Sequence, residues 1–124
     1  MDPIVTCIDR LEEIVGDFKQ VARTADNNMV RDILALRSAY AAEIAKLFTA
    51  VAEDARLKAN PQIAEEFQRR FMEARHLIAK MQTRWRVADI ENDPHGYLED
   101  IRMIDAHSAG AREWGKRALQ KAAA

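Results

Sequence analysis

Each of the three prolines in the sequence follows directly after an Asp or an Asn residue. An Asp or Asn side chain accepts hydrogen bonds from the free amides at a helix N-terminus. Proline is tolerated at the first helical position because its missing N–H has no partner there. A further helix start is predicted in segment 24–28, the other cluster of turn and capping residues. The three proline pairs predict helix starts at Asp2-Pro3, Asn60-Pro61 and Asp93-Pro94.

Apolar residues recur at alternating spacings of three and four between these starts, which is the pattern of one apolar face on a long helix. The pattern predicts helices over residues 3–24, 28–58, 61–91 and 94–121. In the third segment the apolar face holds Phe67, Phe71, Ala74, Ile78, Met81 and Trp85.

Short connections between long amphipathic helices favour antiparallel neighbours. We therefore predict an all-α fold, an antiparallel up-down four-helix bundle formed by a single domain over residues 1–124. The composition agrees, because the chain has only four Gly and three Pro residues and lacks the strict apolar alternation of strands. The alternative is an extended helical hairpin that completes its core only by dimerising.

The formal net charge of −1 gives no reason to expect an anionic membrane or nucleic acid as a partner. Cys7 is the single cysteine, which excludes a disulfide within the chain and is typical of a reducing compartment. The N-terminal segment carries Asp2 where a signal peptide has its basic region, and no apolar stretch approaches the length of a membrane span. We therefore expect a cytoplasmic protein without a membrane partner.

The first predicted helix is about eight residues shorter than the second and third, or about 12 Å at the normal helical rise. One end of the bundle, around residues 50–68, is therefore expected to lack one wall. We expect this end, or a whole face of the bundle, to bury apolar surface in a homodimer. The large apolar residues near this end are Val51, Leu57, Ile63 and Phe67.

Glu73 and His76 form a Glu-x-x-His pair, which is half of the motif of di-iron bundle proteins. Such a site requires a second pair and two more carboxylates, and the apolar stripe places His76 nearly opposite the core. We therefore expect no metal site and interpret the pair as an exposed contact. An exposed mid-helix histidine is also what a histidine phosphotransfer domain uses, with Lys80 and Arg69 as candidates for steadying a phosphoryl group on His76. This similarity is one of architecture, because that family's Lys and Gly after the histidine are not matched.

His107, Gly110 and Trp114 fall on one face of the fourth predicted helix. A glycine inside a helix costs about 1 kcal/mol relative to alanine, so Gly110 and Gly115 are expected to have a packing or functional reason. The functional interpretation is a pocket for a ligand or partner at His107, Gly110 and Trp114. The favoured interpretation is close helix–helix packing, in which the small residues accommodate a bulky ring such as Trp85.

The third and fourth predicted helices each begin with acidic residues and end with basic ones. The helix dipole favours this order, and adjacent antiparallel helices could pair the two kinds of block. The basic residues of the third helix are also suited to phosphate contacts. Because the acidic blocks balance them, we do not expect a nucleic-acid partner.

The sequence contains no glycine-rich phosphate loop, no serine elbow and no Cys/His cluster. We therefore expect no catalytic residue, cofactor or metal ligand. The favoured hypothesis is a non-enzymatic helical-bundle protein that acts as an interaction or adaptor protein, with a protein partner or a second copy of itself. The two alternatives are a histidine phosphotransfer-like signalling protein that uses His76, and a small-molecule or metal-binding bundle near His107.

Overall fold

The computed structural model describes residues 2–123, and every regular element in that range is an α-helix. The all-α prediction is therefore confirmed. The helices are α1 (Pro3–Thr24), α2 (Met29–Glu53), α3 (Ala55–Lys58), α4 (Pro61–Arg84), α5 (Val87–Asn92) and α6 (Pro94–Ala123).

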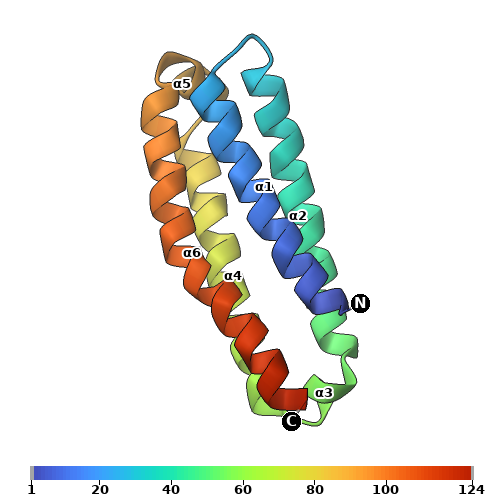
Figure 1. Cartoon of the computed structure of the whole chain (residues 1–124). Coiled ribbons are helices and arrows are strands. Elements are labelled where there is room, and N and C mark those ends of the chain that lie inside the picture. Colours follow the sequence, from blue (N-terminus) through green and yellow to red (C-terminus); the bar gives the residue numbers. More distant parts are fainter. Residues whose placement is uncertain (1, 124) are drawn as a thin grey trace.

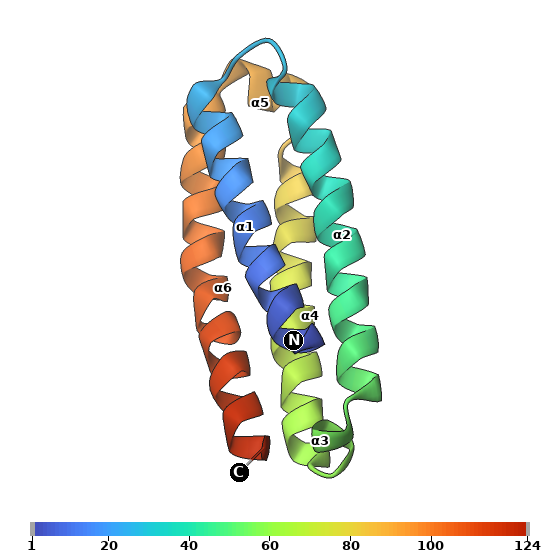
Figure 2. The ribbon, with the colours of Figure 1, turned by 45° about the vertical axis from the view of Figure 1, so that its right-hand side comes forward.

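The four long helices α1, α2, α4 and α6 lie side by side along their lengths (Figure 1). Helix α1 packs against α2 and α6, and α4 packs against α6 and α2. The short helix α5 lies at the same end as the loop between α1 and α2, whereas α3 lies at the other end (Figures 1 and 2). We call the α5 end the upper end and the α3 end the lower end.

Two of the three predicted Asx caps form. The Oδ1 atom of Asp2 accepts a hydrogen bond from the backbone N–H of Ile4 at 3.0 Å. The Oδ1 atom of Asp93 accepts one from the backbone N–H of Gly96 at 2.9 Å. These bonds satisfy amides that the first turns of α1 and α6 leave without a helical partner.

The remaining two helix starts use other contacts. Asn60 precedes α4 but makes no capping bond, and its side-chain amide donates instead to the carbonyl of Arg56 in α3 at 2.9 Å. Asn28 precedes α2 and also makes no side-chain cap. The Oδ1 atom of Asp26 accepts from the backbone N–H of Asn28 at 2.8 Å, so α2 begins at Met29, one residue later than predicted.

The predicted helix over residues 28–58 is interrupted at Asp54, so that prediction was wrong in its last part. The backbone of Asp54 is extended, with φ −73° and ψ 124°. Its Oδ1 atom accepts hydrogen bonds from the backbone N–H groups of Arg56 at 2.9 Å and Leu57 at 3.2 Å. The cap starts a separate short helix, α3, which turns the chain toward α4.

The predicted helix over residues 61–91 ends at Arg84, so this boundary was also wrong. Trp85 leaves the helical conformation, with φ −107° and ψ 93°. Its indole Nε1 donates to Oδ2 of Asp100 on α6 at 2.8 Å, and its ring packs edge-on against Tyr97, with ring centroids 5.5 Å apart. The chain therefore bends where Trp85 turns toward α6, and α5 begins after this bend.

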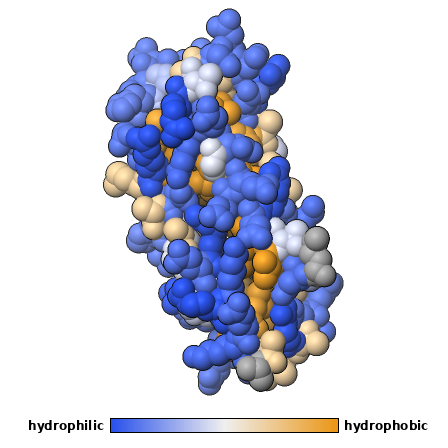
Figure 3. All heavy atoms as spheres, viewed as in Figure 1, coloured by the Kyte–Doolittle hydropathy of each residue, from blue (hydrophilic) through white to orange (hydrophobic). Residues whose placement is uncertain are grey.

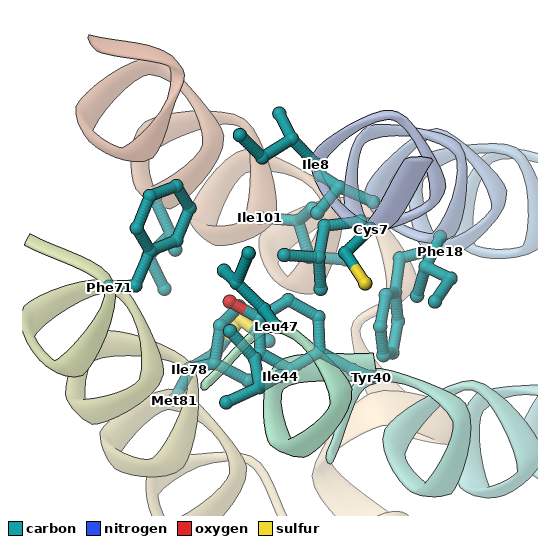
Figure 4. Close-up of a cluster of buried hydrophobic side chains, with 14 of the residues drawn as sticks. Cys7, Ile8, Phe18, Tyr40, Ile44, Leu47, Phe71, Ile78, Met81 and Ile101 are labelled. Carbon is teal, nitrogen blue, oxygen red and sulfur yellow. The ribbon is translucent and has the colours of Figure 1, made fainter. Parts of the chain in front are cut away.

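The hydrophobic core lies between the four long helices (Figure 4). The residues of the predicted apolar stripes supply most of it, and Cys7 is buried among them. Each of the following side chains has less than a tenth of its surface exposed: Ile4, Ile8, Leu11, Phe18, Ile33, Tyr40, Leu47, Phe71, Ile78, Met81 and Ile101.

The lower end of the molecule is closed, which contradicts the expectation of a missing wall. Val51, Leu57 and Phe67 are buried within the chain, and Ile63 is half-buried. Leu57 belongs to α3, which packs against α2, α4 and α6 and covers this end. The interruption at Asp54 thus allows α3 to form the wall that the shorter α1 does not provide.

Two glycines of α6 provide a matched test of the packing. A Cβ at Gly115 would lie 3.0 Å from Cδ1 of Ile8 and 3.2 Å from Cε1 of Phe67, whereas a Cβ at Gly110 would meet no atom within 4 Å. We expect Gly110→Ala to raise the free energy of unfolding by about 0.5–1 kcal/mol through helix propensity. We expect Gly115→Ala to be less stable than Gly110→Ala by about 1 kcal/mol or more, because Ile8 and Phe67 must shift. Urea denaturation measures both, and equal stabilisation would contradict the close approach at Gly115.

Candidate functional site

His107, Gly110 and Trp114 lie along the edge of α6 that faces α4. The Nε2 atom of the exposed His107 is 3.6 Å from Oε1 of Glu73 on α4. The half-buried ring of Trp114 packs against Phe67 on α4, with ring centroids 4.9 Å apart. The structure therefore brings the three predicted residues to one seam between α4 and α6.

Gly110 is exposed, and its surroundings exclude the predicted packing role. Nothing lies within 4 Å of a Cβ built there, so the interpretation that Gly110 accommodates the ring of Trp85 was wrong. The ring of Trp85 instead lies against Gly96, whose Cβ would be 3.1 Å from it. The close helix–helix approach that was expected of both glycines occurs at Gly115 alone. Gly110 leaves the seam open.

Three open hollows follow one another along the edge of α6 that faces α4, and we call them together the α4–α6 groove. Their volumes are about 490, 220 and 610 Å³ from the upper to the lower end. The upper hollow is lined by Arg84, Trp85, Asp89, Gly96, Glu99, Asp100 and Met103. The middle hollow is lined by Arg69, Arg70, Glu73, Ala74, Leu77, His107, Ser108, Gly110 and Ala111. The lower hollow is lined by Ile63, Trp114, Arg117, Ala118, Gln120 and Lys121.

Trp114 is held between the middle and lower hollows by an arginine. The guanidinium carbon of Arg70 lies 4.7 Å from the centroid of the Trp114 ring, which is a cation–π contact. The Nε atom of Arg70 also donates to Glu66 at 2.7 Å, and Arg69 donates to the same carboxylate. Hydrogen bonds from Arg69 and then Arg70 lower the pKa of Glu66 to about 2. An ionised Glu66 therefore orients both arginines beside the groove.

The charges that line the groove change sign along it. Three carboxylates and one arginine line the upper hollow, whereas four cations and one carboxylate line the middle and lower hollows together. Arg117 and Lys121 are exposed, and neither has an ion-pair partner among residues 2–123. The lower part of the groove thus presents uncompensated positive charge.

His76 is exposed on α4, as the sequence predicted, but its two expected helpers do not converge on it. Arg69 is bound to Glu66 and lies 4.0 Å from Glu73. Lys80 is exposed one turn further along α4. Glu73 lies near His107 rather than forming an ion pair with His76. Among residues 2–123, no three His, Cys, Asp or Glu side chains are grouped closely enough to hold a metal ion.

A polar cluster inside the core was missed by the sequence analysis. Arg112 is only 9% exposed, and its Nη2 atom donates to Oδ1 of Asp105 at 2.6 Å. Lys19 of α1 donates to the other carboxylate oxygen of Asp105. A signal was present in the sequence, because Asp105, Ser108 and Arg112 continue the spacing of three and four that starts at Ile101.

The polar cluster borders a small, partly enclosed cavity of about 20 Å³. Ser108, whose hydroxyl has no hydrogen-bond partner in the structure, lines both this cavity and the middle hollow of the groove. Tyr40 lines the cavity from α2, and burial raises its pKa to about 12 although the charge of Arg112 opposes the shift. Ala74 and Ser108 thus border both the groove and the cavity at this level.

The pKa of Asp105 is set by two opposing effects. Burial raises it, but the hydrogen bonds from Lys19 and Arg112 outweigh burial, and the pKa is lower than in a free Asp. The carboxylate of Asp105 is therefore ionised at neutral pH and neutralises Arg112 inside the protein.

Comparison with known proteins identifies no family or relative for this chain. The chain matches no protein-family model, and no curated protein or solved structure is significantly similar to it. No helix within residues 2–123 has the length and apolar character required to cross a membrane.

Replacing Asp105 tests the buried pair, and Asp9 provides a control. We expect Asp105→Asn to lower the free energy of unfolding by roughly 3 kcal/mol near neutral pH, because Arg112 loses its buried anion. A depressed pKa stabilises the folded state above the unfolded value near 4, and this contribution is lost as pH falls through the folded pKa. The difference between the variant and the original chain is therefore expected to shrink on acidification to about pH 3. It is measured by urea denaturation at both pH values.

Asp9 forms an exposed pair that serves as the control, because its Oδ1 atom lies 2.5 Å from Nζ of Lys116 and the pair joins the same two helices as the Lys19–Asp105 contact. We expect Asp9→Asn to change stability by at most about 0.5 kcal/mol. An equal loss in both variants would show that burial of the Asp105–Arg112 pair has no special effect.

Proposed function

We propose that this chain is a non-enzymatic interaction module, an antiparallel up-down four-helix bundle whose working surface is the α4–α6 groove. The proposal places the protein in the cytoplasm, in line with its single, buried Cys7. The bound partner is a protein, and a second copy of this chain in a homodimer is one such partner.

The observation that carries the proposal is the incomplete burial of large apolar side chains along the groove. Met103 of the upper hollow is 71% exposed, and the ring of Trp114 is only half-buried where it borders the lower hollow. Large exposed aliphatic and aromatic side chains beside hollows provide the anchors of protein interfaces. The face shown in Figure 3 is mostly hydrophilic, with hydrophobic atoms mainly in narrow strips between helices. A groove, rather than a broad apolar patch, therefore fits the proposal.

Site-specific crosslinking in the native cell tests this function. We expect a photoreactive benzoylphenylalanine at Gly110 to capture a protein, because this position opens into the middle hollow. The same residue at Ser38, which is exposed on α2 and does not line the groove, is the control. Mass spectrometry identifies the captured protein, and a product of two copies of the chain would indicate a homodimer.

The captured protein is then tested with purified components. We expect Gly110→Trp to weaken its binding at least about tenfold, or about 1.4 kcal/mol, because the ring fills the middle hollow. Ser38→Trp is expected to bind normally. Capture from Ser38 alone, or equal affinity of both variants, would reject the groove as the working surface.

A second candidate function is histidine phosphotransfer by His76, which is favoured by its exposure on the middle of α4. The commitment of Arg69 to Glu66 gives this alternative less support. Incubation with acetyl phosphate tests it. Phosphotransfer requires acid-labile phosphate on the original chain and none on a folded His76→Gln variant. If the chain acts only as an interaction module, neither the original chain nor the variant will carry phosphate that depends on His76.

A third candidate is binding of a small molecule near His107, which the hollow beside Gly110 would admit. The open shape of that hollow and the contact of His107 with Glu73 across it favour a peptide-like ligand over an enclosed one. Crosslinking from Gly110 separates the two cases, because a small-molecule site would capture no protein.

A further inference from the structure

We infer that the middle and lower hollows together bind an acidic amphipathic helix of a partner protein. This inference rests on the proposed function and names the chemistry of the partner. We call these two hollows the basic groove, which is lined by the residues given above for the middle and lower hollows.

The basic groove has an apolar floor with one rigid anchor. Leu77 and Ile63 of α4 and Ala111 of α6 are half-buried there. The Trp114 ring stands between the two hollows and is fixed by Phe67 on one side and Arg70 on another. A partly exposed ring that is already fixed loses little conformational freedom when a partner covers it.

The length of the groove matches a helical ligand. On the α6 side the groove extends from His107 to Lys121, which is about 21 Å at the helical rise of about 1.5 Å per residue. A partner helix of about four turns covers this distance and presents apolar side chains to the floor at spacings of three and four. The open backbone at Gly110 allows the partner helix to approach closely at the centre.

Charge complementarity selects an acidic partner. Arg117 and Lys121 are four residues apart on α6, so they lie one turn apart on the same side of the groove. Both lack ion-pair partners among residues 2–123. Arg69 and Arg70 lie on the opposite side, and Glu73 is the one carboxylate among the described residues that lines the basic groove. Glutamates one turn apart on a partner helix would face these cations on both sides of the basic groove. The acidic upper hollow would repel the same helix and limits it to the basic groove.

NMR titration of the labelled chain with three synthetic peptides tests the inference. Each peptide has about 18 residues and the same leucine face, and the other face carries Glu, Lys or Ser. We expect the Glu peptide to shift the indole N–H signal of Trp114 and the amide signals of Gly110 and Ala111. The indole signal of Trp85, in the upper hollow, is the internal control and is expected to remain unchanged. The Lys and Ser peptides are expected to bind at least about tenfold more weakly.

Charge reversal locates the interaction on the chain. We expect the double variant Arg117→Glu/Lys121→Glu to weaken the Glu peptide on the order of tenfold, and raised salt to weaken the original complex as well. Arg75→Glu is the matched control, because Arg75 is exposed on α4 and does not line the groove. Its effect is expected to be less than about twofold. All of these side chains are exposed, and circular dichroism verifies that each variant is folded.

The outcomes separate this inference from the proposed function. Equal binding of the Glu and Lys peptides, or an equal loss in the Arg75 variant, would overturn the acidic-helix inference. Tighter binding of a single-stranded oligonucleotide of the same charge at Trp114 would replace the helix by nucleic acid and would also overturn it. A protein captured from Gly110 through a non-acidic segment would refute the inference and leave the interaction function intact. Absence of any capture from Gly110 would refute the proposed function itself.

Discussion

The apolar faces of the four long helices are removed from water only when the helices lie side by side, because a single helix has no surface against which to bury its own apolar face. Most of the stability of each helix therefore comes from this packing. Leu47, Met81 and Tyr97 have no exposed surface, and each belongs to a different helix. Burial of each such side chain contributes roughly 1.5–3 kcal/mol. The positions of the seams, of the groove and of the exposed histidines all follow from this packing.

The two seams along α6 show how small and charged residues modify the packing. Gly115 allows Ile8 of α1 and Phe67 of α4 to approach α6 closely, and Lys19 of α1 reaches Asp105. On the side of α4, the Arg84–Asp100 pair bridges the upper end at 2.6 Å, but nothing fills the space beside Gly110. Glycine therefore occurs in α6 both where neighbouring helices approach closely, at Gly115, and where the seam with α4 stays open, at Gly110.

The core contains a charged pair that a purely apolar packing does not require. A buried ion pair loses hydration on both partners, and its contribution to stability is often small. The contact between Lys19 of α1 and Asp105 of α6 nevertheless favours one rotation of α6 about its axis, because that rotation turns Asp105 toward α1. The same rotation places His107 and Trp114 at the edge facing α4, so this contact between helices helps to position the groove.

The function proposed for the groove rests on the site, because no similar fold supplies an analogy. The basic groove combines the fixed ring of Trp114 with cations on both of its sides. This combination is the basis of the proposed interaction function.

The amino-acid sequence by itself determined the helical class, the helix starts at Pro3, Pro61 and Pro94, and the exposure of His76. These properties depend on residues within one or two turns of one another, through capping bonds and the spacing of apolar side chains. The sequence also placed His107, Gly110 and Trp114 on one edge of a helix, for the same reason. Only the tertiary structure decided what that edge faces. The helix end at Arg84, the contact between Arg70 and Trp114, and the burial of Arg112 depend on the register between helices distant in the chain. That register results from the packing of all side chains at once, which no local pattern contains.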